Sequence, residues 1–136
     1  MKNKLTKTII PSILLLSVLF LWGCKKEPGV GGNASISGKV IVRKYNATFT
    51  SFLGEYPAQD HYVYIVYGEH SGYDSRIKTD YEGNYQFRFL YPGKYTVYTY
   101  SLDSTGQSLS GQIVVKQVAE LNRKEAKVLS NMQIHE

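Results

Sequence analysis

The sequence predicts an all-β protein: one antiparallel β-sandwich of about seven strands, preceded by a separate N-terminal segment. Three observations lead to this prediction. Apolar and polar residues alternate with a period of two in several short stretches. Tyrosine and β-branched residues fill those stretches, and the chain holds 12 tyrosines. Turns that contain glycine or proline separate the stretches at regular intervals.

The alternation is clearest in four stretches, at residues 35–43, 62–67, 85–89 and 95–100. In the third, every second residue from Tyr85 to Phe89 is aromatic, so we expect these rings to face the core. Shorter strand candidates lie at residues 75–79, 111–118 and 124–134. Because each sheet of such a sandwich has one face inward and one in water, the alternation predicts antiparallel sheets.

The connections between these stretches are short, with one exception. Residues 68–72, 81–84, 91–93 and 103–106 each contain glycine or proline, which supply the backbone angles that a tight turn needs. The link from Tyr45 to Asp60 is longer and contains Phe49, Phe52 and Leu53. We expect this apolar loop to fold back over a sheet edge or to contact a partner.

The N-terminal segment reads as a targeting signal. Three lysines, Lys2, Lys4 and Lys7, precede an apolar run at residues 9–22. The run is shorter than the roughly 20 residues that a membrane-spanning helix needs, which favours a secretory signal. The alternative is a short anchor that stays uncleaved.

The end of the apolar run, Leu21-Trp22-Gly23-Cys24, resembles the lipobox of bacterial lipoproteins. The resemblance implies cleavage before Cys24 and attachment of several acyl chains to that residue, which together hold a protein firmly on a membrane. It therefore implies that the protein is held at the cell envelope by the lipid attached to Cys24. Because Lys25 rather than an aspartate follows, it implies the outer membrane and leaves open whether the periplasmic or the surface face is occupied.

This interpretation divides the chain into three parts. Residues 1–23 are the signal peptide, residues 24–34 are the lipidated cysteine and a flexible glycine-rich tether, and residues 35–136 are the sandwich. The net charge of +5 falls to +2 without the signal peptide, because that segment holds three lysines and no acid. Nucleic-acid binding needs a concentrated basic face, and so small a net charge is poor evidence for one, so we predict no nucleic-acid partner.

The order of four motifs resembles the carboxypeptidase regulatory-like domain, which is a transthyretin-like (prealbumin-like) β-sandwich. The motifs are ISGKV at 36–40, VYI at 63–65, KTDYEGNYQF at 78–87 and LYPGKYTV at 90–97. The resemblance covers residues 35–102 and implies the fold more than a function. It also implies that the strands at 61–67 and 94–101 are neighbours in one sheet. Asp80, Gly83, Pro92 and Gly93 form turns in this scheme.

Four tyrosines form the main binding candidate. By parity they face away from the core, and the implied strand order brings them into one outward patch, with two basic residues nearby: Tyr62, Tyr64, Tyr98 and Tyr100, with Arg76 and Lys78. Tyrosine offers a large contact area at a small entropic cost and is enriched at interfaces. The patch is therefore interpreted either as a binding surface for an envelope protein or glycan, or as cross-strand pairs that stabilise a wet sheet.

Signs of catalysis are weak. His70 lies in a glycine-flanked turn and His61 precedes a strand, and no serine or cysteine nucleophile accompanies them. Asp74, Asp80 and Glu82 are too few for a calcium site and are interpreted as turn formers. We therefore predict no catalytic residue, metal or cofactor, and a membrane-anchored module for binding or assembly. The alternatives are a carbohydrate-binding module that uses the tyrosines, and a small hydrolase that uses His70 or His61.

Overall fold

The structure, a computed structural model, describes residues 26–136. This part of the chain is all-β, as predicted, and contains no helix that is long and apolar enough to span a bilayer. The signal peptide predicted at residues 1–23 and Cys24 lie outside the described residues. Nine strands are present where about seven were predicted: β1 (Val30–Tyr45), β2 (Phe52–Pro57), β3 (Tyr62–Tyr67), β4 (Ser75–Lys78), β5 (Asn84–Leu90), β6 (Gly93–Leu102), β7 (Gln112–Leu121), β8 (Ala126–Val128) and β9 (Met132–His135).

The first sheet is built around the long strand β1. One edge of β1 pairs antiparallel with β5 and then β2, and the other edge pairs parallel with β8 and then β9. The sandwich is therefore not purely antiparallel, which corrects the prediction. Parallel neighbours need a long crossover connection, and here strands β2 to β7 provide it between the first and last strands.

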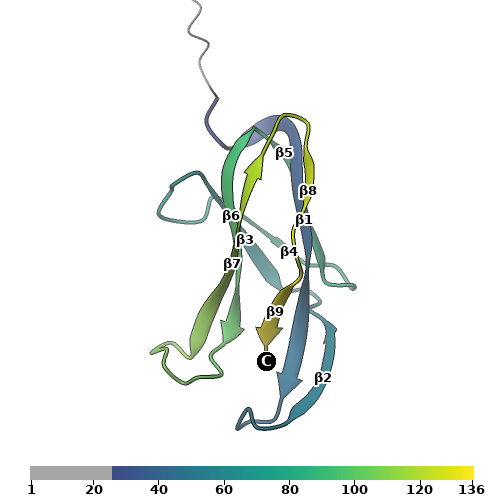
Figure 1. Cartoon of the computed structure of the whole chain (residues 1–136), viewed down its shortest axis with the longest axis vertical. Coiled ribbons are helices and arrows are strands. Elements are labelled where there is room, and N and C mark those ends of the chain that lie inside the picture. The colour runs from purple at the N-terminus through teal and green to yellow at the C-terminus, as the bar shows by residue number, and fades with distance from the viewer. Residues whose placement is uncertain (1–25) are drawn as a thin grey trace, which may run out of the picture.

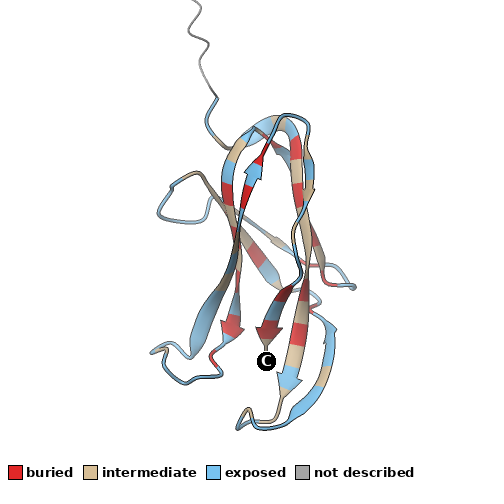
Figure 2. Cartoon of the chain, in the orientation of Figure 1, coloured by how far each residue is buried: buried red, intermediate tan, exposed pale blue. Residues whose placement is uncertain are grey.

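The second sheet has the order β4-β3-β6-β7 and is antiparallel throughout. Figure 1 shows the two sheets as facing layers, with the start of β1, the β5–β6 turn and the β7–β8 turn at the upper end. The β1–β2 and β6–β7 connections lie at the lower end. In Figure 2 buried residues recur at alternate positions along the strands, as the sequence pattern requires.

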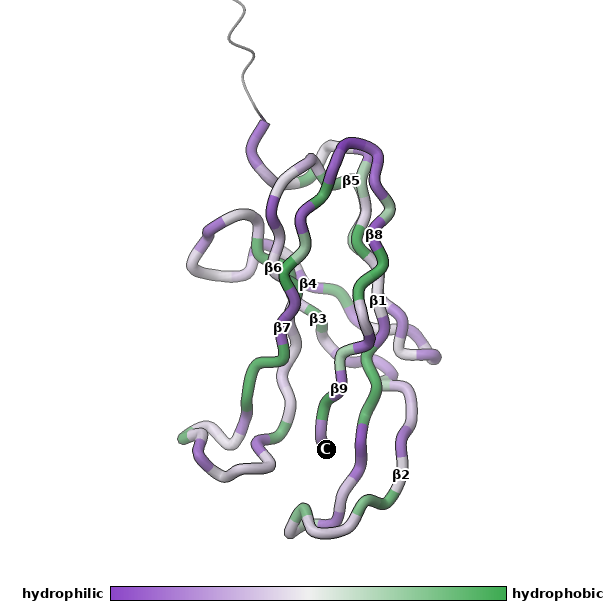
Figure 3. The backbone as a smooth tube through the Cα atoms, viewed as in Figure 1, coloured by the Kyte–Doolittle hydropathy of each residue, from purple (hydrophilic) through white to green (hydrophobic). Residues whose placement is uncertain are grey.

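The core lies between the sheets and receives side chains from both. Its fully buried members include β-branched residues of β1 and β3 and the ring of Tyr95. The alternation is also visible in Figure 3, where hydrophobic and hydrophilic residues follow one another along β1. Burial of these apolar side chains stabilises the fold by about 1.5–3 kcal/mol for each large residue.

The segment from Tyr45 to Asp60 is a hairpin rather than an irregular loop. Its strand β2 pairs with residues 41–45 of β1 and so lies along the sheet edge, where Phe52 and Leu53 remain exposed. The sequence pattern does not predict this strand, because it contains Gly54 and Pro57, and both residue types are typical of turns.

Residues 30–34 belong to β1, although the sequence placed them in the flexible tether. The preceding residues are also packed on the domain. The Gly29 amide donates to the Tyr95 hydroxyl at 2.9 Å, and the Tyr91 amide donates to the Gly29 carbonyl at 2.8 Å. The ordered domain thus begins before residue 35, because the Gly29 backbone groups form hydrogen bonds with residues far away in the sequence.

Phe89 does not face the core, which corrects the prediction from parity. Its backbone has φ 59°, and the register of the β1–β5 pair shifts nearby. One extra residue in a strand reverses the alternation beyond it, so Leu90 is buried and Phe89 is 67 % exposed.

Candidate functional site

The four predicted patch tyrosines lie together on the outer face of the second sheet. Tyr64 and Tyr98 are direct partners across β3 and β6, and their rings stack with centroids 5.1 Å apart and planes 13° apart. Tyr100 meets both rings edge-on at 5.6 and 5.8 Å. Tyr62 lies 6.3 Å from Tyr64 on the same strand.

A fifth tyrosine joins the cluster from outside the strands. Tyr73, in the β3–β4 loop, is 51 % exposed and packs edge-on against Tyr64 at 5.1 Å. Sequence analysis missed it because parity applies only within a strand. The tyrosine face is defined here as Tyr62, Tyr64, Tyr73, Tyr98 and Tyr100.

Basic residues flank these rings on both sides. Arg76 of β4 lies over the Tyr62 ring at 4.6 Å, and Lys78 lies over the same ring at 5.1 Å. On the other flank, Lys116 of β7 is the direct strand partner of Tyr98. The contacts of Arg76 and Lys78 with the Tyr62 ring are each worth about 0.5–1 kcal/mol, the usual range at exposed sites.

Positive charge therefore exceeds negative charge on this face. Lys78 is paired with Asp60 at 2.8 Å, and Glu120 lies opposite Lys94 at the far end of β7. Arg76 and Lys116 have no ion pair among the described residues. Burial among its neighbours raises the pKa of Tyr98 from its ordinary value of 10.0. A tyrosine hydroxyl is neutral at pH 7 even without that shift, so the rings add no negative charge.

One ring face of each central tyrosine is already occupied. Tyr64 and Tyr98 cover one another, and Arg76 and Lys78 lie over Tyr62. Since side chains stand roughly perpendicular to a sheet, the stacked rings present their edges and hydroxyl groups to solvent. The arrangement suits hydrogen bonding and edge contacts better than stacking of a flat ligand.

The two histidines are not brought together. His61 bonds to the Thr99 hydroxyl at 2.8 Å beside the start of β3, whereas His70 lies beyond the end of that strand. His70 contacts the Asp74 carboxylate at 2.7 Å and its side chain is 60 % exposed. A strand of six residues, roughly 20 Å, separates the two, so they cannot act on one substrate atom.

The acidic residues considered for calcium binding have local roles. Asp80 accepts the amides of Glu82 and Asn84 at 2.9 and 2.8 Å, and the Asn84 amide is the main reason that its pKa is lowered. Asp74 accepts the Tyr67 amide at 2.7 Å. No group of three or more His, Cys, Asp or Glu residues that could hold a metal occurs within residues 26–136.

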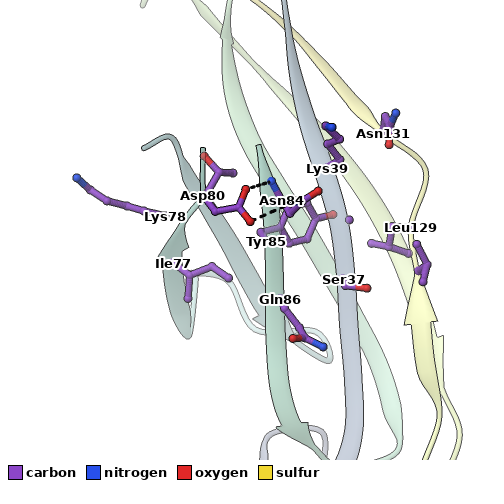
Figure 4. A pocket seen from close by; sticks show the side chains of 13 residues that line it. Ser37, Lys39, Ile77, Lys78, Asp80, Asn84, Tyr85, Gln86, Leu129 and Asn131 are labelled. Atoms are coloured by element: carbon purple, nitrogen blue, oxygen red, sulfur yellow. Dashed lines mark hydrogen bonds between the residues drawn. The ribbon is translucent and has the colours of Figure 1, made fainter. Parts of the chain in front are cut away.

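A cleft of about 800 Å³ opens beside β5, lined by β1 and β5 of the first sheet and by β4 of the second. Figure 4 shows that its side chains do not point to a common centre: Lys78 extends away from β5, while Lys39 and Asn131 lie on the far side of β1. Its lining includes the buried hydroxyl of Tyr85, which has no hydrogen-bond partner. The cleft thus lacks converging chemistry, and the tyrosine face is the stronger candidate site.

Comparisons with known proteins add no further constraint. No protein-family model matches the chain, and no curated protein is significantly similar to it.

Proposed function

We propose that this protein is a lipid-anchored, non-catalytic module of the cell envelope that binds an acidic segment of a partner protein through the tyrosine face. The observation that supports this best is the row Arg76–Tyr64–Tyr98–Lys116, which follows strand pairing across all four strands. Tyrosine and arginine are the residue types most enriched among those that dominate binding energy.

The positive charge at both ends of the row favours an acidic partner. Arg76 and Lys116 stand at its two ends, and a carboxylate that approached either would form a charge-assisted hydrogen bond. The Tyr64 hydroxyl raises the pKa of Arg76. Arginine is protonated at neutral pH in any case, so that end of the row is positively charged. An acidic peptide segment would meet cations at both ends and tyrosine edges between them.

A glycan ligand is the less favoured alternative for the same face. A sugar that stacks on tyrosine needs an open ring face. Tyr64 and Tyr98 cover one face of each other's ring, and Tyr73 and Tyr100 contact Tyr64 edge-on, so the central rings offer a sugar less open face than isolated tyrosines would. Tyr73 and Tyr100 are more exposed, and a glycan that used them would not need Arg76 or Lys116.

The anchor and the family remain part of the proposal. The lipobox-like sequence that ends at Cys24 supports lipidation. The motif order described above supports a transthyretin-like domain. A two-sheet arrangement of residues 26–136 is compatible with that family.

A photo-crosslinking experiment tests the binding function. A benzophenone amino acid is placed at Tyr100 in one strain and, as a matched control, at Gln86 on the outer face of the other sheet. We expect illumination of intact cells to yield one discrete protein adduct from position 100 and none from position 86. The Tyr100 adduct should disappear when Arg76 and Lys116 are both replaced by glutamate.

Two outcomes would contradict the protein partner. Equal adducts from both positions would show non-specific contact. Selective binding to a glycan array by wild type, lost in Tyr73→Ala with Tyr100→Ala, would transfer the face to the carbohydrate alternative.

The anchor is tested separately by metabolic labelling with an alkyne-bearing fatty acid. Wild type should incorporate the label, and the variant Cys24→Ala should not. Equal labelling of the two proteins would overturn lipidation at Cys24.

A further inference from the structure

We infer that the upper end of the sandwich is a membrane-contacting surface that lies on anionic lipid headgroups, with Phe89 at the bilayer interface. This inference rests on the proposed lipid anchor and adds an orientation to it. The surface, called the anchor pole here, comprises Lys26, Val30, Phe89, Arg123 and Lys124. All five belong to segments that meet at the upper end in Figure 1.

The first step is that the chain entering the domain is fixed at this pole. Lys26 donates to the Tyr91 hydroxyl at 3.2 Å and lies over the Tyr91 ring at 4.7 Å. The Gly29 backbone is bound on both sides, by the Tyr95 hydroxyl and the Tyr91 amide. Pro28 packs so closely on Gly93 that a side chain there would meet it at 2.6 Å.

The second step is the distance to the lipid. Cys24 precedes Lys26 by two residues, and two residues of chain span at most about 7 Å. A lipid on Cys24 would therefore hold the anchor pole at the membrane surface rather than on a long tether.

The third step is the chemistry of the pole. Phe89 and Val30 are 67 and 64 % exposed, and Val30 lies opposite Leu90, the residue after Phe89. At the same end, the exposed cations Lys26, Arg123 and Lys124 line one cavity, with Glu120 as its acidic member. Figure 3 shows the β7–β8 turn as a hydrophilic arc above the strands. An exposed aromatic ring at the same end as a group of basic residues suits the interface of a bilayer with anionic lipids.

Backbone geometry gives independent support. Phe89 and Lys124 have φ of 59° and 61°, a region that bulky residues seldom occupy. Glycine or asparagine would fit both turns at lower cost. Residues kept in such positions commonly mark surfaces where the side chain has a task.

The experiment places a single tryptophan at either end of the molecule. The one natural tryptophan, Trp22, precedes Cys24 and is absent after cleavage, so processed wild type is the blank. Phe89→Trp reports on the anchor pole, and Leu109→Trp reports on the β6–β7 loop at the opposite end, where Leu109 is fully exposed. The purified processed lipoproteins are incorporated into phosphatidylcholine vesicles with phosphatidylglycerol and a nitroxide-labelled lipid.

We expect the tryptophan at position 89 to lose more than half of its emission and the one at position 109 to lose almost none. Adding Arg123→Glu and Lys124→Glu should reduce the quenching at position 89 in anionic vesicles and leave it unchanged in pure phosphatidylcholine. Each cation contributes about fivefold to association with an anionic surface.

The outcomes separate the two levels of the proposal. If vesicle-bound protein shows no quenching at position 89, or equal quenching at both positions, the anchor pole is overturned while the anchor stands. If the processed protein fails to remain with the vesicles, or if Cys24→Ala remains equally well, the lipid anchor itself is overturned.

Discussion

The two sheets of the sandwich present different side chains to the solvent. The outer face of β3 and β6 carries stacked tyrosines with cations beside them. The outer face of β1 and β5 carries small or polar residues such as Ser37 and Gln86, which are direct partners across the two strands. Both faces satisfy the same alternation, so the sandwich does not require aromatic residues on a wet face. This contrast favours a binding role for the tyrosine face over a purely structural one.

The inner faces also differ. In the first sheet, backbones and rings approach closely at glycines: Gly38 lies under the Tyr85 ring, and Gly83 lies against the Val40 carbonyl. The second sheet depends instead on β-branched side chains of β3 and β6, such as Val63 and Val97. Glycine substitutions should therefore harm the first sheet, and tyrosine substitutions should harm binding by the second.

The largest effect is expected from Gly83→Ala. Gly83 has φ +78°, and an added Cβ would lie 2.4 Å from the Val40 carbonyl oxygen. Backbone strain and the clash together should lower the free energy of unfolding by about 3 kcal/mol. Urea denaturation measures the loss. Gly106→Ala has similar strain at φ +68° with open space around it, so it should cost only about 1 kcal/mol. Equal losses in the two variants would refute the close packing.

The next effect separates binding from stability on the tyrosine face. Tyr64→Ala with Tyr98→Ala should lower partner binding by at least about tenfold and the free energy of unfolding by only about 1–2 kcal/mol. The matched pair Ser37→Ala with Gln86→Ala, on the other face, should change neither quantity. Adduct yield at position 100 and urea denaturation report the two quantities. A loss of several kcal/mol with unchanged binding would make the tyrosines structural.

Alkaline stability tests the close packing of the first sheet. Burial raises the pKa of Tyr85 to about 12 from 10.0, so the hydroxyl stays protonated in the fold after it ionises in the unfolded chain. Ionisation of Tyr85 has no effect on stability below pH 10, and the fold loses stability relative to the ionised unfolded chain as the pH rises from 10 towards 12. Tyr85→Phe should reduce this loss, although burial also raises the pKa of Tyr67 and Tyr95. Near pH 7 the variant should be neutral or more stable by up to about 1 kcal/mol, because the buried hydroxyl has no partner. Thermal unfolding across pH checks both points, and an unchanged alkaline profile would contradict them.

The smallest effect concerns the two long hairpins at the lower end. Asp103 accepts bonds from Thr105 and Ser108, led by the Thr105 hydroxyl, and its pKa falls from 3.8 to about 2. In the β1–β2 hairpin the corresponding residue is Asn46, which accepts the Thr50 and Ser51 amides. Its side chain is uncharged. A lowered pKa gives stability that is present above pH 3.8 and lost as the pH falls through 2.

Asp103→Asn should remove the part of the stability that depends on ionisation of Asp103. The stability of the variant should therefore change less than that of wild type between pH 3.8 and about 2. The protection factors of amides 104–111 against hydrogen exchange, measured as a function of pH, report the effect locally. Asn46→Ala should weaken the β1–β2 hairpin equally at every pH. Wild-type protection factors of the β6–β7 hairpin that do not depend on pH would contradict the assignment.

Much of this architecture follows from local sequence. Alternation identifies β3, β5 and β6, and it places Tyr62, Tyr64, Tyr98 and Tyr100 away from the core, because side-chain direction in a strand depends only on parity. Glycine and proline mark the turns for reasons equally local. The all-β class required no knowledge of the tertiary structure.

Pairing between distant segments decided the rest. Sequence does not state that β8 and β9 run parallel to β1, that Tyr73 and Lys116 join the tyrosines, or that residues 26–34 are fixed to the domain. Phe89 shows the limit of parity, since a bulge with positive φ turns Phe89 outward and Leu90 inward. Local pattern sets which way each side chain points, whereas the neighbours it meets depend on hydrogen bonds between strands far apart in the chain.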